Sequence, residues 1–286
     1  MNEPSVSVRN LTKAFSGRRV VDDLSFDVHR GEVFALLGHN GAGKTTLLRA
    51  IMGLARPDGG EIALLGGSPR DAGCRAGAAA VFEDSFFFGG LTANQIERVM
   101  RGSVPGWERA RYELLLEQFE LPPDKPVKEF SKGMRMKLNL AAALARRPRL
   151  LVLDEPTSGL DPVARGELLD ILMEFMQDER CGILISSHIT SDLDQIADEI
   201  AYLHGGEMMF QRTRVELQEE MAVARCSAAQ LDALPEELVI ARRRGFFGDA
   251  ALVREPERVR ALLPGAVVEP VGLDEMMRFY SGRDEK

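Results

Sequence analysis

The sequence of 286 residues has no long apolar run, although apolar residues make up 45% of it. A membrane-spanning helix needs roughly 18 consecutive uncharged residues, and no segment approaches that length, so we expect the chain itself to be soluble. The chain begins MNEPSVSVRN, without the basic and apolar segments of a secretory signal. Export of the chain is therefore not expected.

The sequence also has few cysteines and no net positive charge. Cys74, Cys181 and Cys226 are odd in number and far apart, which argues against a disulfide framework and a metal cage, so we predict three reduced packing residues. The net charge is -8, with 36 Lys and Arg against 44 Asp and Glu. This balance opposes a purely electrostatic interaction with nucleic acid or anionic lipid.

The apolar runs and turns that are present predict an α/β fold. Short β-rich stretches from 6 to 37, separated by SGRR and HRGE, predict a small sheet that leads into one buried strand. A helix is predicted from Lys44 to Gly53. Two apolar runs, 150–153 and 182–187, flank a helical pattern from Val163 to Met176. This alternation is typical of a parallel sheet covered by helices on both faces.

The rest of the chain divides into regions of different composition. Residues of about 90–147 are predicted to be helical without a strand, and 201–210 is predicted to be a hairpin with a two-glycine turn. After Arg214 the sequence becomes rich in Glu and Arg and less periodic. We therefore predict a main domain over 1–214, with a helical subdomain at about 84–147, and an accessory domain over 215–286.

The most specific motif is LLGHNGAGKTTLL at 36–48. It contains the pattern G-x-x-x-x-G-K-[ST] between a buried strand and a helix, the context in which this pattern is credible. Glycines let backbone N–H groups and a helix N-terminus point at an anion, lysine adds a positive charge, and threonine offers a hydroxyl to magnesium. We therefore predict a nucleoside triphosphate site made of Gly38, Asn40, Gly41, Gly43, Lys44, Thr45 and Thr46.

A second motif, which is acidic, indicates what the bound nucleotide is used for. It is needed because a phosphate loop alone fits a kinase, a GTPase or a motor. LLVLDEP at 150–156 ends a buried strand with Asp154 and Glu155. An acidic residue at the carboxyl end of a strand beside the phosphate loop is well placed to hold hydrated magnesium, and Asp154 is predicted to do so together with Thr45. Glu155 is predicted to point the other way and to act as general base on the attacking water.

Four segments stand in a fixed order after the phosphate loop: FSKGM at 130–134, LDEP at 153–156, SGLDP at 158–162 and SSH at 186–188. With the loop they resemble the nucleotide-binding subunit of ABC transporters, over roughly residues 5 to 212. The resemblance implies a P-loop NTPase of ABC type. Its parts are a small antiparallel β subdomain, a mostly parallel sheet core and a helical subdomain, followed here by a small C-terminal appendage.

The segment FSKGM has a physical interpretation of its own. Ser131 can cap a helix beginning near Met134, which leaves an anion site with free N–H groups at Gly133. The resemblance implies that Ser131 and Gly133 bind the γ-phosphate held by a second subunit, so that ATP lies between two subunits in a head-to-tail dimer. Lys132, in place of a family glycine, either faces the partner's phosphates or is a solvated surface lysine.

Four further residues take their roles from the resemblance. His188 is implied to reach the γ-phosphate and the attacking water, and Asp161 to link the two sites of the dimer. Phe15 matches the aromatic position that stacks on adenine, although a phenylalanine at a strand end is often part of the core. Glu83 stands where the family has a magnesium-ligating glutamine. A carboxylate can also bind the ion, but it adds negative charge beside the phosphates.

Three segments keep more than one interpretation. FFF at 86–88 is either core of the helical subdomain or an apolar socket for a helix of a membrane subunit. RRRGFF at 242–247 is favoured as a solvated loop over a contact with lipid headgroups or RNA. The appendage after 215 is either regulatory or strengthens dimerisation.

The sequence therefore predicts an ATPase subunit that uses ATP and Mg²⁺ to drive a separately encoded membrane permease. Three segments resemble bacterial type-2 exporter ATPases: PGWERARYELLLEQF at 105–119, LDEMMRFYSG at 273–282 and S-K-G-M at 131–134. This resemblance implies that the permease is an exporter and that the ATPase subunit lies on the cytoplasmic side of the cell membrane. The second ATPase subunit of the dimer is either identical or related, and no nucleic acid partner is predicted.

The alternative from another class is a soluble ABC ATPase acting on nucleic acid or ribosomes. Such proteins carry two cassettes or a long coiled-coil insertion, whereas this chain has one cassette and a short gap between Glu83 and Ser131. A catalytically idle binding module is disfavoured by the complete set of hydrolytic residues.

Overall fold

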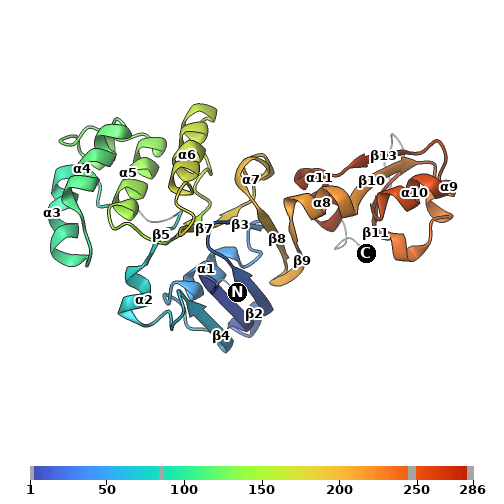
Figure 1. Cartoon of the computed structure of the whole chain (residues 1–286), viewed down its shortest axis with the longest axis horizontal. Helices are drawn as coiled ribbons and strands as arrows, with labels where there is room; N and C mark the ends of the chain where they lie inside the picture. Colours follow the sequence, from blue (N-terminus) through green and yellow to red (C-terminus); the bar gives the residue numbers. More distant parts are fainter. Residues whose placement is uncertain (1–2, 84–86, 244–248, 282–286) are drawn as a thin grey trace. The chain divides into compact units, whose positions relative to one another are not determined.

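A computed structural model describes residues 3–83, 87–243 and 249–281 of the chain (Figure 1). The backbone divides into two compact units, one made of Met1–His188 and Ile196–Phe210 and the other of Ile189–Gln195 and Gln211–Lys286. Among the described residues, no helix is both long enough and apolar enough to cross a membrane.

The first unit is built on a six-stranded sheet. Its strands lie in the order β5 (Ala78–Val81), β6 (Leu150–Asp154), β7 (Gly182–Ser187), β3 (Val33–Leu37), β8 (Glu199–His204) and β9 (Glu207–Thr213). The four pairings from β5 to β8 are parallel. Every residue of β3, β6 and β7 is buried, as continuous apolar runs in a covered parallel sheet require. The predicted α/β fold with a mostly parallel sheet is therefore confirmed.

Strands β8 and β9 form the predicted two-glycine hairpin. They are neighbours in the sheet, and only Gly205 and Gly206 separate them. Both glycines have positive φ, 58° and 92°, which is the conformation that a type I′ hairpin turn requires at both central positions. A two-residue connection can join only antiparallel strands, so β9 is antiparallel to the other strands of the sheet.

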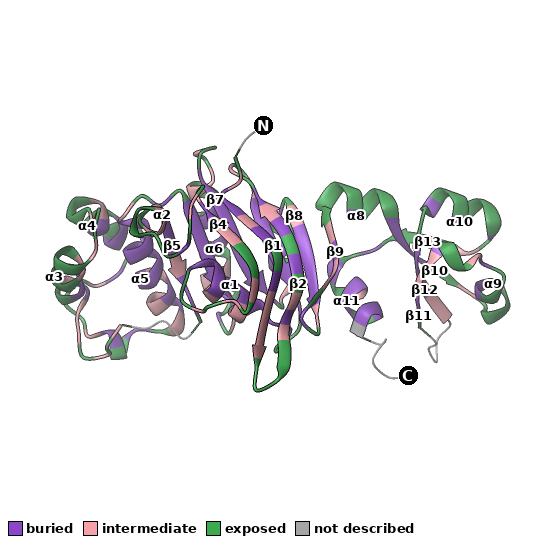
Figure 2. Ribbon diagram, turned by 90° about the horizontal axis from the view of Figure 1, so that it is seen from below, coloured by how far each residue is buried: buried purple, intermediate pink, exposed green. Residues whose placement is uncertain are grey.

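A smaller antiparallel sheet packs over helix α1 (Lys44–Ile51) and the large sheet. Its order is β2 (Arg18–Val28), β1 (Val6–Phe15) and β4 (Gly59–Leu64). Leu47, Leu48 and Ile51 of α1 are fully buried in a core shared by both sheets (Figure 2). The helix ends at Ile51, two residues before the predicted Gly53, because Gly53 already turns the chain with a φ of 70°.

The middle of the chain is helical, as predicted. It contains α3 (Ala93–Ser103), α4 (Arg109–Gln118), the short 3₁₀ helix η1 (Val127–Glu129) and α5 (Lys132–Leu144). A capping box of Thr92 and Gln95 starts α3. In the segment 105–119, the Trp107 ring lies 5.0 Å from the ring of buried Tyr112, whose hydroxyl donates to the Ala93 carbonyl. These aromatic residues therefore join α3 to α4.

Helices also flank the large sheet along the chain. They are α2 (Ala72–Ala76) and α6 (Pro162–Phe175). Helix α7 (Thr190–Ile196) follows β7 along the chain and lies mostly in the second unit. Helix α6 matches the predicted bounds of 163–176 to within one residue at each end. Leu168, Leu169 and Leu172 form its buried side.

The second unit contains a sheet with its own core. The order along the chain is α8 (Arg214–Glu220), β10 (Met221–Cys226), α9 (Ala228–Asp232), the 3₁₀ helix η2 (Glu236–Leu238), β11 (Val239–Arg243), β12 (Asp249–Arg254), α10 (Pro256–Leu262), β13 (Val267–Pro270) and α11 (Leu273–Ser281). The strands pair antiparallel in the order β11-β12-β10-β13. This is the βαββαβ arrangement of ferredoxin-like domains, which the weak periodicity after Arg214 did not predict.

Two of the segments with open interpretations extend beyond the described part. In FFF, Phe86 lies outside the described residues. Phe88 is described, and it is 78% exposed. Phe88 is therefore not a core residue. In RRRGFF, residues 244–247 lie outside the described residues. The three cysteines are free thiols, and Cys181 is buried, as predicted.

Candidate active site

The candidate catalytic residues lie at the edge where the parallel strands of the large sheet end. Gly38 follows β3, Asp154 ends β6, His188 follows β7 and Glu83 comes two residues after β5. These four strands are neighbours in the order β5-β6-β7-β3. Loops after adjacent parallel strands open at one edge, so segments far apart in the sequence form one site.

The phosphate loop is closely packed against its neighbours. A Cβ atom on Gly38 would lie 2.6 Å from the Leu203 carbonyl oxygen of β8, and one on Gly43 would collide with the Val20 carbonyl oxygen of β2. Gly43 also has a φ of 101°, which L side chains rarely adopt. The motif therefore needs glycine at both positions, for backbone packing as well as for phosphate access.

We expect Gly43→Ala to lower the free energy of unfolding by about 3 kcal/mol or more, since backbone strain and overpacking add. Gly41 is the matched comparison, because its φ is 84° but a Cβ there would meet open space. Gly41→Ala should cost only about 1–2 kcal/mol of backbone strain. Urea unfolding of both variants measures the difference, and equal losses would contradict the packing argument.

Lys44 is buried inside the curve of this loop. Its Nζ donates to the Gly38 carbonyl at 2.5 Å and to the His39 carbonyl at 3.3 Å. The same Nζ lies 3.0 Å from Oε1 of Glu155, an ion pair rather than an aligned hydrogen bond. Glu155 therefore neutralises the ammonium group that the sequence predicts will meet phosphate.

Glu155 also contacts the histidine after β7. Its Oε2 lies 2.6 Å from Nδ1 of His188 and accepts the His188 backbone N–H at 3.2 Å. The Glu155 side chain is 8% exposed and that of His188 is 38% exposed. Glu155 thus connects Lys44 to His188, and the two residues predicted to be catalytic are in direct contact.

Asp154, next to Glu155, has different partners. It is 2% exposed, and its Oδ1 accepts a hydrogen bond of 2.7 Å from the hydroxyl of Ser186. Ser186 was not predicted as a site residue. Its place opposite Asp154 in the β6–β7 register follows from strand pairing, which the motif SSH alone does not reveal.

The residues predicted to bind magnesium offer oxygen atoms at this edge. Thr45 is half-buried in the first turn of α1, Asp154 ends β6, and Glu83 is exposed. The preceding Phe82 is buried, with its ring 5.6 Å from the Arg49 guanidinium of α1. Among the described residues, no group of three or more His, Cys, Asp or Glu could hold a metal alone. This donor set fits Mg²⁺, which binds through one or two carboxylates plus substrate phosphates.

A histidine of the phosphate loop adds a titratable group that was not predicted. Partial burial lowers the pKa of His39, and the positive charges of His204, Lys44 and His188 lower it further. These surroundings therefore favour the neutral form of His39. The surrounding GHNG turn gave no signal of this in the sequence, because His204 ends β8 and His188 follows β7, both far along the chain.

Other predicted residues lie at the starts of α5 and α6. Ser131 is the N-cap of α5, and its hydroxyl accepts the Met134 N–H at 3.1 Å. The helix begins at Lys132, so the predicted start near Met134 was wrong by two residues, because helical geometry begins directly after a cap residue. Gly133 is buried, and a Cβ on it would lie 3.0 Å from Cβ of Ala164 in α6.

Asp161 and Lys132 complete this second group. Asp161 is the N-cap of α6 and accepts the N–H groups of Val163 and Ala164, each at 3.0 Å; these bonds, led by that from Ala164, lower the pKa of its carboxyl. Lys132 is half-buried, and a Cβ on Gly159 would lie 2.6 Å from its Nζ. The Lys132 side chain thus packs on the SGLDP segment of its own chain, a contact that was not predicted.

Phe15 lies in a third place, at the end of β1. It is 54% exposed, so it is not a core residue. The ammonium of Lys13 lies 5.2 Å from the centre of its ring. Asp58 fixes this strand end, because its Oδ1 pairs with Lys13 at 2.9 Å and its Oδ2 accepts the Ala14 N–H at 2.7 Å. The ring is therefore available for a flat ligand.

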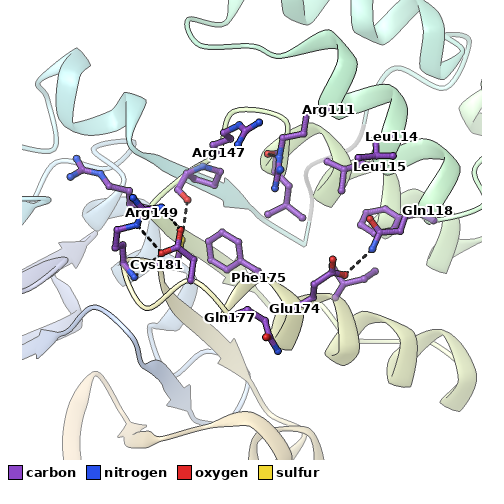
Figure 3. A pocket seen from close by; sticks show the side chains of 16 residues that line it. Arg111, Leu114, Leu115, Gln118, Arg147, Arg149, Glu174, Phe175, Gln177 and Cys181 are labelled. Atoms are coloured by element: carbon purple, nitrogen blue, oxygen red, sulfur yellow. Dashed lines mark hydrogen bonds and ion pairs between the residues drawn. The ribbon is translucent and has the colours of Figure 1, made fainter.

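A cavity of the first unit lies elsewhere. It encloses about 640 Å³ where β6 and β7 begin, between α4 and α6 (Figure 3). Some of its polar side chains already have partners: Arg180 pairs with Asp178 at 2.7 Å, and Gln118 donates to Glu174 at 2.7 Å. None of the predicted site residues lines it. It is therefore not the candidate active site.

Comparisons with known proteins identify the family of the chain. The ABC transporter family matches residues 21–158. An uncharacterized ABC transporter ATP-binding protein, YhcH of Bacillus subtilis, is 34% identical over 209 residues, which is 71% of this chain and 68% of the relative. Nod factor export ATP-binding protein I of Ralstonia nicotianae is 37% identical over 231 residues, 75% of this chain and 68% of the relative.

A solved structure is also similar. It is described as an ATP binding subunit of an ABC transporter, is 32% identical, and superposes with a TM-score of 0.66. The match covers 74% of this chain and 91% of the solved one.

Proposed function

The chain belongs to the ATP-binding subunits of ABC transporters, which hydrolyse ATP to power transport, and on that premise we propose that it works as one half of a head-to-tail dimer. The partner half is a second copy or a related ATPase subunit. ATP binds between the phosphate loop of one subunit and the start of α5 of the other. The family implies a membrane permease as partner, and we propose that this permease is encoded separately.

The observation that carries this proposal is that the site residues lie in two groups on different elements of the chain. Lys44, Glu155 and His188 are in contact around the phosphate loop. Ser131 and Gly133 form a capped helix N-terminus, which favours an anion. A dimer brings the second group of one subunit to the phosphates held by the other.

The chemistry is phosphoryl transfer to water, in which positioning and charge neutralisation supply most of the catalysis. Lys44 binds the β- and γ-phosphates after it leaves Glu155. Glu155, held by His188, orients the attacking water and accepts its proton. His188 supports the Glu155 carboxylate and contacts the γ-phosphate.

For magnesium, we propose that Thr45, Asp154 and Glu83 hold the hydrated ion beside the phosphates. When bound, the ion neutralises charge on the β- and γ-phosphate oxygens. Asp154 is buried and accepts from Ser186, so it has a fixed orientation. Glu83 is exposed and follows the strand next to β6.

The direction of transport is proposed from the relatives. The name of the Ralstonia nicotianae relative describes Nod factor export, and the motif S-K-G-M is of the type found in exporters of this family. We propose an exporter whose ATPase subunits bind the permease at the cytoplasmic side of the cell membrane.

Phe15→Ala tests the proposed adenine contact. Base stacking on an aromatic side chain contributes about 1–3 kcal/mol, so ATP affinity should fall about 5- to 150-fold. Phe15→Trp retains a flat ring and should bind ATP within a few-fold of the wild type. Titration of each variant with ATP, and with analogues that carry other bases, measures the nucleotide affinity. Unchanged affinity in Phe15→Ala would remove this residue from the site.

The proposed assembly is tested by purification from membranes and by kinetics. We expect the tagged chain to co-purify in detergent with a protein of several membrane spans, and its ATPase activity per milligram to rise with protein concentration, because two chains complete each site. Co-purification with ribosomes or DNA instead would favour the alternative class. A specific activity independent of concentration, without any detectable dimer, would contradict the shared site.

A further inference from the structure

Ser186 lies between the two acidic residues of the site. It is fully buried in β7, opposite Asp154 of β6 in the parallel register. Its hydroxyl donates to Oδ1 of Asp154 at 2.7 Å and accepts the backbone N–H of Glu155 at 3.1 Å. One side-chain oxygen therefore contacts both members of the Asp-Glu pair.

The backbone around Glu155 is strained, which makes these contacts important. Glu155 has a φ of 50°, an uncommon conformation for a residue with a side chain. Its N–H is shared between the carbonyl and the hydroxyl of Ser186, each at 3.1 Å. If the hydroxyl were removed, the carbonyl would still accept this N–H, so the position of Glu155 would be largely retained.

Among the described residues, Oδ1 of Asp154 has no second donor besides the Ser186 hydroxyl. Without the Ser186 hydroxyl, a buried carboxylate oxygen would lose its donor, a costly state that side-chain rotation or water would relieve. The bond also occupies Oδ1 and leaves Oδ2 for another ligand. Loss of the Ser186 hydroxyl should therefore disturb the orientation of Asp154 while the position of Glu155 is largely retained.

We propose that Ser186 is a positioning residue that orients the Asp154 carboxylate for the hydrated magnesium ion. This inference rests on the proposed magnesium-binding role of Asp154. A group that orients a metal-binding carboxylate typically contributes a factor of about 10–100 to metal affinity. Ser186 acts through Asp154 and has no direct contact with ATP in this proposal.

The experiment compares four forms of the full chain: wild type, Ser186→Ala, Ser186→Thr and Ser186→Val. Thr and Val have nearly the same shape and differ by the hydroxyl, so their comparison separates hydrogen bonding from packing. Mn²⁺ is the probe ion, and its affinity for each protein with a non-hydrolysable ATP analogue is measured by electron paramagnetic resonance. Binding of the analogue in EDTA and the melting temperature are measured in parallel.

We expect Ser186→Ala and Ser186→Val to bind Mn²⁺ about 10-fold or more weakly, and Ser186→Thr to stay within about 3-fold of the wild type. Analogue binding in EDTA should not change in any form. Equal Mn²⁺ affinity in all four forms, or equal losses in Ser186→Thr and Ser186→Val, would overturn the proposal. A wild type that binds Mn²⁺ no better with the analogue than without it would instead refute the proposed magnesium site.

Discussion

Glu155→Gln is expected to lower the ATP turnover number about 10²- to 10⁴-fold while ATP binding persists, because an amide cannot accept the proton of the attacking water. The shape of the side chain is kept, and an amide oxygen can still accept the His188 N–H. The ion pair with Lys44 at 3.0 Å is lost, so Lys44 is free for phosphate and ATP should bind at least as tightly as in the wild type.

The measurements are steady-state hydrolysis, ATP titration and size-exclusion chromatography with ATP. The variant should accumulate as an ATP-bound dimer, since reopening depends on hydrolysis. Glu117→Gln makes the same change on the exposed face of α4 and is the control. A Glu155→Gln protein that hydrolyses ATP at the normal rate and remains monomeric with ATP would remove Glu155 from the mechanism.

Lys44→Ala is expected to lose ATP affinity by at least about 10-fold, because the phosphates lose a buried cation. The structure adds a second effect that occurs without nucleotide. Glu155 is left buried with only His188 as its side-chain partner among the contacts described above, which should lower the free energy of unfolding by about 1–3 kcal/mol.

Titration with a fluorescent ATP analogue and urea unfolding without nucleotide measure these two effects. Lys125→Ala removes the same charge from an exposed loop position and should change neither. A double variant with Glu155→Gln gives a further check, because it removes the buried carboxylate and should recover part of the stability but not the affinity. Recovery of ATP affinity in the double variant would show that Lys44 acts mainly by neutralising Glu155.

Much of the first unit could be predicted because its signals are local. The apolar runs of β3, β6 and β7 are continuous, and each is followed directly by a site residue. Parallel strands place the residues that follow them at one edge, so Lys44, Asp154 and His188 could be expected near one another before the structure was known.

The contacts that were not predicted join segments far apart in the sequence. The Ser186–Asp154 bond depends on which strands are neighbours and on their register. Lys132 packs over Gly159 because α5 begins beside the loop that leads to α6. The second unit was predicted as a separate region, but its strands are short and their pairing order is not encoded in a periodic pattern.

The tight fit of Gly38 and Gly43 against β8 and β2 has a thermodynamic consequence for ATP capture. The curved loop is supported from behind by two neighbouring strands, which hold its shape. Little conformational entropy then remains to be lost there when a nucleotide arrives. The affinity for ATP is instead set by electrostatics, because the triphosphate replaces the Glu155 carboxylate beside Lys44. ATP binding should therefore weaken with rising salt more than with rising temperature.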